Sequence, residues 1–380
     1  MLKLAVIFES SPFDRKGLFN AVHERIRHLL DTEECTIDAY CIHSWDTAFT
    51  RRMRHTPEVP RVENVEIDGV MYRILWYDFS IIDHVTVEVL HCRPLLFNRF
   101  IDRNVGLLKG YDAVLAHSFT GGLLAMEASG RFGVPYFMTW HGSDIHTHPW
   151  RNPLVLKYTR MVMQGASYNF FVSEALMKVS DKLCTDVPKD VLYNGVAPGF
   201  LQFKDREGEK KVVAFVGSLV AVKNVESLQP IFHQVRMMYD GPLEFWIVGD
   251  GKMRHKVETA LMSDDSINVV MWGNRPASVM PAIMNEIDVL VLPSHNEGLP
   301  LVCAEAIRCG AYAVGADVGG VAEVVGKDYA VPHGDDFILS MASKVVSLLK
   351  NGGEQTVPAH LDWAVTAEKE MSFIRRGLSS

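Results

Sequence analysis

The sequence contains no long hydrophobic run, and this absence bears on any contact with membranes. The apolar run that opens it covers residues 1–8 and is only about eight residues long. A membrane span needs about 20 apolar residues, and a signal peptide needs an apolar core followed by a cleavage site. We therefore expect neither, and predict a cytoplasmic protein that lies at most peripherally on the inner face of a membrane.

Cysteine is scarce, and no two cysteines have the Cys-x-x-Cys spacing of a zinc or redox site. The six cysteines are scattered: Cys35, Cys41, Cys92, Cys184, Cys303 and Cys309. We expect free thiols, most of them buried. The sequence also lacks an Asp-x-Asp motif at the end of a strand, and the pair Asp264-Asp265 lies in a polar stretch where surface exposure is expected. We therefore expect no metal site.

Positive charge does not prevail, because 46 Asp and Glu residues outnumber 38 Lys and Arg residues. A net charge of −8 disfavours binding of nucleic acid by the whole protein, which needs a basic face. No Gly-x-Gly-x-x-Gly follows a predicted strand, since Gly249-Asp250-Gly251 stops short of it, and this disfavours a dinucleotide-dependent dehydrogenase. No short repeat is present, which excludes a solenoid.

With 380 residues, of which 48% are hydrophobic and 22% charged, the chain is large enough for two ordinary globular domains. Short runs rich in Val, Ile, Phe and Tyr alternate with amphipathic segments, which is typical of parallel sheets covered by helices. The predicted strands are 3–9, 36–43, 71–77, 113–117, 136–140, 168–172 and 191–194, and then 212–217, 243–249, 267–272, 289–293, 312–315 and 329–331.

Turn residues and then charges interrupt the pattern at residues 194–211. We therefore predict an acceptor-binding domain at residues 1–196 and a donor-binding domain at residues 197–360. Residues 361–380 are expected to form a C-terminal helix that packs back on the N-terminal domain.

The segment 293–306 carries the clearest chemistry, because it runs from a buried strand through a loop into a helix. The carboxyl end of a parallel strand is the usual ligand site of such a sheet. The amides of Leu301 and Val302 should lack intrahelical partners at the positive end of the helix, where they suit a diphosphate. Pro300 precedes them, where its missing N–H costs little.

Two carboxylates, Glu297 and Glu305, flank this anion site with seven residues between them. Phosphates repel carboxylates, so both side chains are better suited to sugar hydroxyls. The alternative is that Glu297 is a solvated loop residue and that Glu305 caps the helix or faces solvent.

The segment resembles the E-x7-E signature of the retaining GT-B glycosyltransferases of group 1, also called family four. Further segments match that family in order and spacing: 139–144 (Thr-Trp-His-Gly-Ser-Asp), 193–196 (Tyr-Asn-Gly-Val), 215–218 (Phe-Val-Gly-Ser) with Lys223, 247–251 (Ile-Val-Gly-Asp-Gly) and 319–325 (Gly-Gly-Val-Ala-Glu-Val-Val). The resemblance covers almost the whole chain, most strongly residues 190–335. It implies an α/β fold of the GT-B type, with two Rossmann-like domains whose parallel sheets face each other across a cleft.

The resemblance also implies roles for individual residues. Glu305 would bind the donor ribose, Glu297 would bind hydroxyls of the transferred sugar, and Lys223 would neutralise the diphosphate leaving group. His141 would contact the donor sugar, so the catalytic set is Glu297, His141 and Lys223. The donor-binding set is Gly217, Ser218, Lys223, Arg275, Gly298, Leu299, Pro300, Leu301, Val302 and Glu305.

One departure concerns Ser218, because the family usually has an arginine at that position. A lone lysine is a weaker phosphate clamp than an Arg–Lys pair. Arg275, in the loop after a predicted strand, could lie near the base or the phosphates and compensate in part; a surface role is the alternative. His117, the last residue of the strand 113–117, and Gly17, where the family has a glycine-rich loop, are weaker candidates for the acceptor side or the cleft.

We therefore predict a retaining, metal-independent glycosyltransferase that needs no cofactor besides its nucleoside-diphosphate sugar substrate. The acceptor would be a saccharide or a lipid-linked saccharide of cell-envelope or exopolysaccharide synthesis. Residues 51–55 and 93–103 mix arginines with bulky apolar residues, a pattern that can lie on anionic lipid headgroups. The alternative is a helix that packs on the sheet with solvated arginines. A nucleotide-sugar epimerase and a non-catalytic nucleotide-sugar-binding protein remain open.

Overall fold

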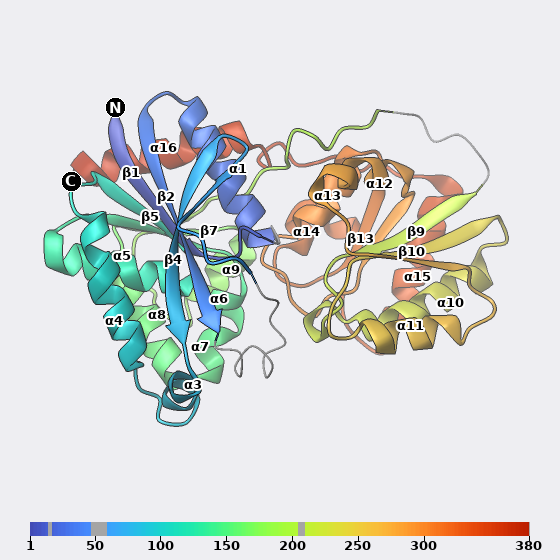
Figure 1. Cartoon of the computed structure of the whole chain (residues 1–380). Coiled ribbons are helices and arrows are strands. Elements are labelled where there is room, and N and C mark those ends of the chain that lie inside the picture. Colours follow the sequence, from blue (N-terminus) through green and yellow to red (C-terminus); the bar gives the residue numbers. More distant parts are fainter. Residues whose placement is uncertain (14–16, 47–58, 204–209, 380) are drawn as a thin grey trace. The chain divides into compact units, whose positions relative to one another are not determined.

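The computed structural model describes residues 1–13, 17–46, 59–203 and 210–379 (Figure 1). The basic stretch 51–55 lies outside the described residues, as does most of the charged stretch 204–211. The chain divides into two compact units. One consists of residues 1–194 together with 363–380, and the other of residues 195–362.

The N-terminal unit contains a sheet of eight strands in the order β3-β4-β2-β1-β5-β6-β7-β8. Its strands are β1 (Leu2–Glu9), β2 (Cys35–Asp46), β3 (Asn64–Ile67), β4 (Val70–Phe79), β5 (Ala113–His117), β6 (Tyr136–Trp140), β7 (Tyr168–Phe171) and β8 (Lys189–Val191). All pair in parallel except β3 with β4. The central strands β5 and β6 are buried along their whole length, which explains their almost purely apolar sequences.

The helices of this unit are α1 (Gly17–Asp31), α3 (Ile81–Glu88), α4 (Leu95–Asn104), α5 (Ser118–Phe132), α6 (Ser143–His146), α7 (His148–Arg151), α8 (Pro153–Gly165), α9 (Glu174–Ser180) and α16 (Trp363–Ser379). Local sequence sets several of their ends. The Ser173 side chain caps α9 by accepting from the Leu176 amide, and Gly133 ends α5 in the left-handed conformation.

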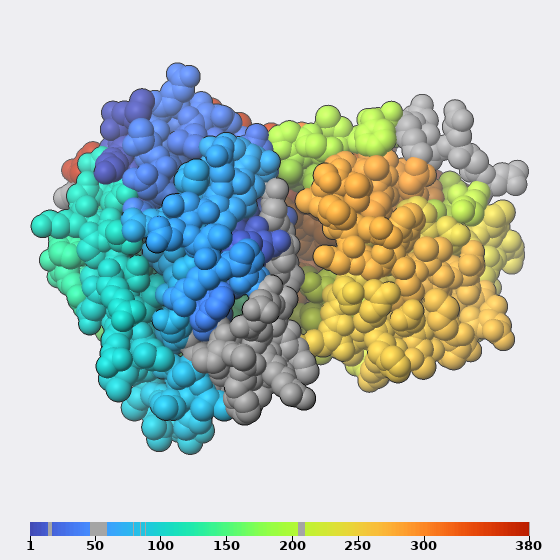
Figure 2. Space-filling view, viewed as in Figure 1, coloured from blue at the N-terminus to red at the C-terminus, as the bar shows by residue number. Residues whose placement is uncertain are grey.

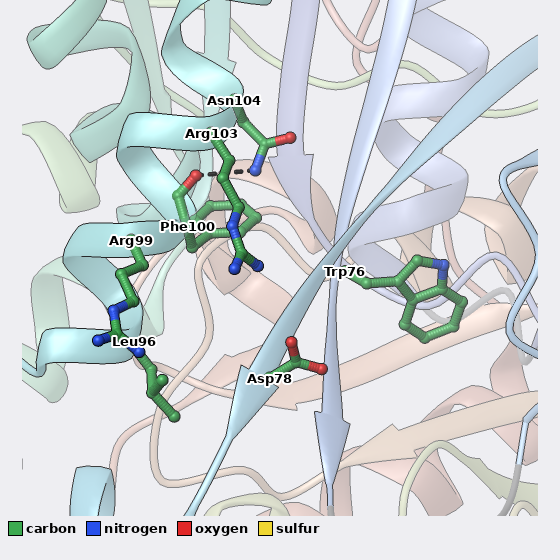
Figure 3. Close-up of a pocket in the computed structure, with 7 residues that line it drawn as sticks. All are labelled: Trp76, Asp78, Leu96, Arg99, Phe100, Arg103 and Asn104. Carbon is green, nitrogen blue, oxygen red and sulfur yellow. Dashed lines mark hydrogen bonds between the residues drawn. The ribbon is translucent and has the colours of Figure 1, made fainter.

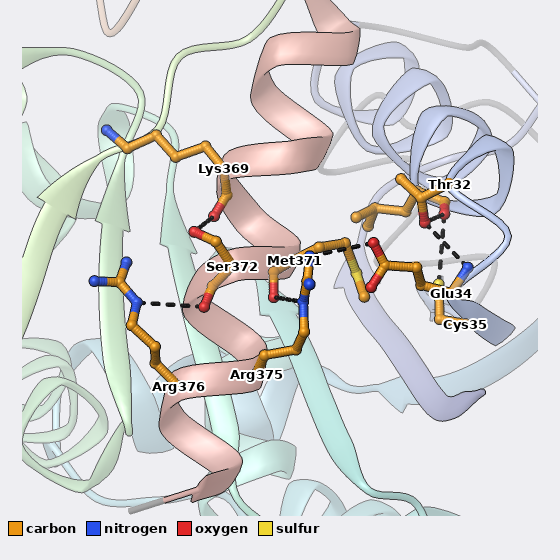
Figure 4. Close-up of polar contacts among 9 residues, drawn as sticks. Thr32, Glu34, Cys35, Lys369, Met371, Ser372, Arg375 and Arg376 are labelled. Carbon is orange, nitrogen blue, oxygen red and sulfur yellow. Dashed lines mark hydrogen bonds and ion pairs between the residues drawn. The ribbon is translucent and has the colours of Figure 1, made fainter.

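The last helix, α16, completes the core of the N-terminal unit although it follows the other unit in sequence. Its buried Met371, Phe373 and Ile374 belong to the same core cluster as the strands of that unit. Its polar side secures it as well, since Arg375 forms an ion pair of 3.1 Å with Glu34, close to the start of β2 (Figure 4).

The C-terminal unit contains a parallel sheet of six strands in the order β11-β10-β9-β12-β13-β14. Its strands are β9 (Lys211–Val216), β10 (Leu243–Val248), β11 (Val269–Gly273), β12 (Val289–Leu292), β13 (Tyr312–Ala316) and β14 (Ala330–Val331). Its helices are α10 (Leu228–Met238), α11 (Arg254–Met262), α12 (Met280–Glu286), α13 (Leu301–Arg308), α14 (Val321–Val325) and α15 (Phe337–Asn351).

Two local predictions were wrong. The strand predicted at 191–194 is β8, which ends at Val191, and the strand β3 was missed. β3 forms an antiparallel hairpin with β4 through Asp68 and Gly69, whose φ angles of 47° and 82° are left-handed. An Asp-Gly pair between two strands is a strong hairpin signal, so the sequence did carry the information.

Within the described parts of the chain, no helix combines the length and the apolar character that crossing a bilayer requires.

Candidate functional site

The strand order of the C-terminal unit directs attention to the edge of the sheet where β9 and β12 end. The chain runs from β9 outward to β10 on one side, and from β12 outward to β13 on the other. The carboxyl ends of β9 and β12 therefore mark the point where the strand order reverses, which is the usual ligand site of an open parallel sheet. The loops that follow these two strands carry Lys223 and Glu297.

Lys223 and Glu297 meet at this edge. The Nζ atom of Lys223 donates to Oε1 of Glu297 at 2.6 Å, and the hydroxyl of the buried Ser294 donates to the same oxygen at 2.6 Å. The side chains of Lys223 and Glu297 are only 24% and 10% exposed. The reading of Glu297 as a solvated loop charge is therefore wrong, because its carboxylate is fixed by two donors.

Backbone contacts hold the surrounding loops together. The His295 amide donates to the Val222 carbonyl at 2.8 Å, which ties the loop after β12 to the loop after β9. Gly319, in the loop after β13, has a φ of +52°, and a Cβ atom there would lie 1.8 Å from the carbonyl oxygen of Glu297. Only glycine permits this approach, so the residue fixes the backbone that carries Glu297.

Glu305 lies on α13, and its environment differs from that of Glu297. Its side chain is partly buried, and no hydrogen-bond or ion-pair partner for its carboxylate is found among the described residues. Burial raises the pKa of Glu305 to about 7. A partly buried carboxyl group without a partner is suited to accept hydrogen bonds from the hydroxyl groups of a ligand.

The start of α13 corrects one prediction about the helix amides. The helix begins at Leu301, but the Leu301 amide donates to the carbonyl of Leu299 at 3.0 Å and is not free. The Val302 amide, in contrast, has no acceptor within the described residues. The backbone from Gly298 to Pro300 forms the loop that leads into the helix, and Pro300 is its N-cap residue.

Ser218 and Arg275 lie in two other loops of the same sheet. Ser218 is exposed in the loop after β9, next to Gly217, so the position has space for a longer side chain. Arg275 is exposed after the edge strand β11, and its guanidinium lies 5.2 Å from the centre of the Trp272 ring. This contact gives Arg275 a structural partner.

Asp264 is mostly buried and has hydrogen-bond partners, although surface exposure was expected. Its carboxylate accepts from Gln229 and from His233, each at 2.8 Å, and its side chain is only 11% exposed. Hydrogen bonds, first of all from Ser266, lower the pKa of Asp264 to about 2.

In the N-terminal unit, two predicted histidines are brought into contact. His117 ends β5 and His141 follows β6, and their atoms Nδ1 and Nε2 are 3.0 Å apart. Burial, and then the charge of Arg25, lowers the pKa of His141 to about 3, and the same causes lower that of His117 well below its usual value. The pair is therefore neutral, with one ring nitrogen donating and the other accepting.

The Asp144 carboxylate supports the turn that carries His141. It accepts from the amides of His141 and Gly142 at distances of 2.8–3.2 Å. Gly142 has a φ of +148°, a conformation that residues with a side chain rarely adopt. These contacts explain why the Trp-His-Gly-Ser-Asp segment places the histidine at the end of the strand.

Arg25, whose charge contributes to the lowered pKa of both histidines, was not among the residues predicted from the sequence. Its guanidinium donates to Thr139 and to Asn194, each at 3.0 Å, and lies 3.7 Å from the buried Glu370 of α16. An arginine within the apolar stripe of α1, beside Val22 and Ile26, was the available signal.

The switch point of the N-terminal sheet lies between β1 and β5. Here Gly121 packs tightly, since a Cβ atom would lie 2.7 Å from the carbonyl oxygen of Ile7, and the Ser118 hydroxyl accepts from the Glu9 amide at 2.9 Å. Gly17 begins α1, and residues 14–16 before it lie outside the described part.

Known families match both units. Residues 210–351 match the family described as Glycosyl transferases group 1, and residues 56–179 match the Glycosyl transferase 4-like domain. An uncharacterised glycosyltransferase of Methanocaldococcus jannaschii is 25% identical over 283 residues, which cover 70% of this chain and 76% of that protein. The glycosyltransferase TuaC of Bacillus subtilis, named for teichuronic acid biosynthesis, is 26% identical over 228 residues, or 57% of this chain and 56% of that protein.

Among solved structures, the HepE protein of Anabaena in complex with UDP and glucose superposes with a TM-score of 0.66. The alignment covers 99% of this chain and 98% of that one at 15% sequence identity, which establishes the fold. Two parallel-sheet, Rossmann-like units confirm the predicted GT-B fold class. Together with the two family matches and the relatives, this fold identifies the chain as a glycosyltransferase of the GT-B type.

Proposed function

We propose that the chain is a retaining, metal-independent glycosyltransferase that transfers a sugar from a nucleoside-diphosphate sugar to a saccharide or lipid-linked saccharide. The observation that carries this proposal is the meeting of Lys223 and Glu297 at the switch point of the C-terminal sheet. A cation and a carboxylate at one point match the two parts of such a donor, since the diphosphate is an anion and the sugar presents hydroxyl groups.

In this proposal Lys223 exchanges its contact with Glu297 for the diphosphate when the donor binds. The unoccupied Val302 amide supplies a second donor at the positive end of α13. Glu305 binds the ribose hydroxyls, and Glu297 binds hydroxyls of the transferred sugar. The HepE structure, solved with UDP and glucose, supports UDP as the first nucleotide to test.

Transfer would follow by attack on the same face of the sugar. The acceptor oxygen bonds to the anomeric carbon as the bond from that carbon to the diphosphate breaks, and the acceptor proton passes to the leaving diphosphate. Lys223 and the Val302 amide stabilise the negative charge that develops, by several kcal/mol in a site that excludes water. His141 is proposed to contact the transferred sugar, and the neutral partner His117 fixes its orientation.

The name of the TuaC relative supports an acceptor from cell-envelope polymer synthesis. The proposed location is the cytoplasm or, peripherally, the inner face of a membrane. A nucleotide-sugar epimerase remains the second candidate. Incubation with a panel of nucleotide sugars separates the two, because a transferase releases nucleoside diphosphate in proportion to an added acceptor, whereas an epimerase converts the donor sugar without an acceptor. Binding without either reaction would overturn both.

Metal independence has its own test. Because the leaving-group charge is assigned to Lys223 and a backbone amide, transfer should continue at an unchanged rate in EDTA. A strict requirement for added Mg²⁺ or Mn²⁺ would contradict the assignment.

A further inference from the structure

An apolar surface of the N-terminal unit is turned toward solvent between residues 81 and 95. The exposed side chains are Ile81 (39%), Ile82 (73%), Val85 (46%), Val89 (66%), Leu90 (62%) and Leu95 (76%). We call these six residues the apolar tip. α3 lies at the lower end of this unit in Figure 1, and light-blue atoms occupy the same end in Figure 2.

The geometry of α3 shows that this exposure follows a helical face. Ile82 and Val85 lie three residues apart on the helix, and Val89, its C-cap residue, follows four residues later, so the three share one side. Asp83 is 3% exposed and takes part in a capping box with Ser80, which fixes the start of the helix. The helix therefore packs with a polar residue inward and presents its apolar stripe outward, the reverse of an ordinary surface helix.

A stripe of arginines continues from the apolar tip along α4. Leu95, Arg99 and Arg103 follow each other at intervals of four residues and share the exposed face, while Phe97 and Phe100 are buried. At a rise of 1.5 Å per residue, Arg99 lies about 6 Å and Arg103 about 12 Å along the axis from Leu95. Figure 3 shows both arginines on α4 beside a hollow of about 80 Å³ that Trp76 and Asp78 of β4 also line.

Neither Arg99 nor Arg103 has an ion-pair partner among the residues that the structure describes. The nearby acids are already engaged, since Asp102 pairs with Arg131 at 2.7 Å and Asp78 pairs with Arg61 at 3.2 Å. The two arginines therefore leave uncompensated positive charge next to the apolar tip.

Arg93 of the same basic segment differs from these two, because it pairs with Glu127 at 2.7 Å and is mostly buried. The basic segment 93–103 thus divides into one structural arginine and two free ones.

We propose that the apolar tip, together with Arg99 and Arg103, is a docking surface for a bilayer that contains anionic phospholipid. Apolar side chains enter the boundary between headgroups and acyl chains to a depth of about 5–10 Å, and cations stay at the headgroup level. The spacing along α4 matches this arrangement of apolar and charged groups, because Leu95 would lie deepest and Arg99 and Arg103 would lie about one and two helical turns above it. Only the purpose of this surface, which is to bring the enzyme to a lipid-linked acceptor, rests on the proposed function.

Co-sedimentation of the full chain with vesicles tests this surface without donor or acceptor. We expect binding to phosphatidylcholine vesicles that contain phosphatidylglycerol, weak binding to phosphatidylcholine alone, and release at high salt. One arginine near an anionic surface is worth about fivefold in affinity, so Arg99→Gln with Arg103→Gln should weaken binding about 25-fold. Ile82→Ser with Val89→Ser should weaken it at least about tenfold.

A matched control carries Leu339→Ser and Lys327→Gln, two exposed positions of the C-terminal unit, and should bind vesicles as the wild type does. All the substituted side chains are exposed, and circular dichroism should show unchanged folding.

Equal binding to both kinds of vesicle, no binding to either, or wild-type binding by the arginine variant would overturn the proposal. So would a dimer, seen by light scattering, that dissociates in the Ile82→Ser, Val89→Ser variant, because a second copy would then be the occupant. Release of nucleoside diphosphate with a water-soluble acceptor should be the same in all variants. That readout belongs to the proposed function, so its failure is distinct from failure of vesicle binding.

Discussion

Glu297→Gln should separate binding of the diphosphate from transfer of the sugar. In the structure the Glu297 carboxylate holds Lys223 at 2.6 Å, and both side chains are mostly buried. A donor diphosphate must therefore compete with Glu297 for this cation. Glutamine keeps the size of the side chain and can accept from Ser294, but it removes the competing charge.

The magnitude follows from the strength of the pair. At 4 Å and an effective dielectric constant of 20, two charges attract by about 4 kcal/mol before desolvation is counted, whereas exposed pairs contribute about 1 kcal/mol or less. Taking about 1 kcal/mol for this partly exposed pair, free nucleoside diphosphate should bind Glu297→Gln about fivefold more tightly. Transfer should fall about 10- to 100-fold, because a charge-assisted hydrogen bond to the sugar, worth about 1.5–3 kcal/mol, is lost.

Isothermal titration calorimetry with UDP and a coupled assay of transfer measure the two effects. Glu354→Gln is a suitable control, since Glu354 is an exposed carboxylate of the same unit. Diphosphate binding that weakens by more than tenfold in Glu297→Gln would contradict this competition, because Lys223 would then depend on Glu297 to bind the anion.

Further variants test the remaining parts of the site. The pKa of Glu305 is about 7, and ribose hydroxyls favour its ionised form, so the affinity for UDP should rise several-fold from pH 6 to pH 8. This rise should exceed any rise in the Glu305→Gln variant. Parallel pH profiles of the two proteins would contradict the ribose contact. Ser218→Arg, at an exposed position, should tighten diphosphate binding about tenfold in a titration with UDP, whereas weaker binding would mean that this space is already used. In Gly319→Ala the new Cβ atom would lie 1.8 Å from the carbonyl oxygen of Glu297, so the backbone of Glu297 should shift and kcat should fall at least about tenfold. A fully active variant would show that this backbone position is unimportant for transfer.

The sequence predicted the elements of the C-terminal unit well because their signals are local. The apolar run that became β12 ends at Leu292, the turn residues after it form a loop, and α13 begins at Leu301, where a helix start was expected. The order of the strands, and with it the switch point, depends on pairing between distant segments, which local sequence patterns do not determine.

The contacts within the candidate site could not be predicted in the same way. Lys223 and Glu297 are 74 residues apart, and their pairing depends on how two loops fold against each other. The same holds for His117 with His141, and for Arg25, whose partners come from three distant segments. The engaged amide of Leu301 depends on the backbone conformation around Pro300, which residue types alone do not fix.

The proposed site places a nucleoside-diphosphate donor where β9 and β12 end. A crystal structure of the protein with UDP tests it most directly. We expect diphosphate oxygens about 3 Å from the Lys223 Nζ atom and from the Val302 amide, with ribose hydroxyls on Glu305 and the Glu297 carboxylate released from Lys223. A diphosphate bound elsewhere, with the contact between Lys223 and Glu297 intact, would contradict it.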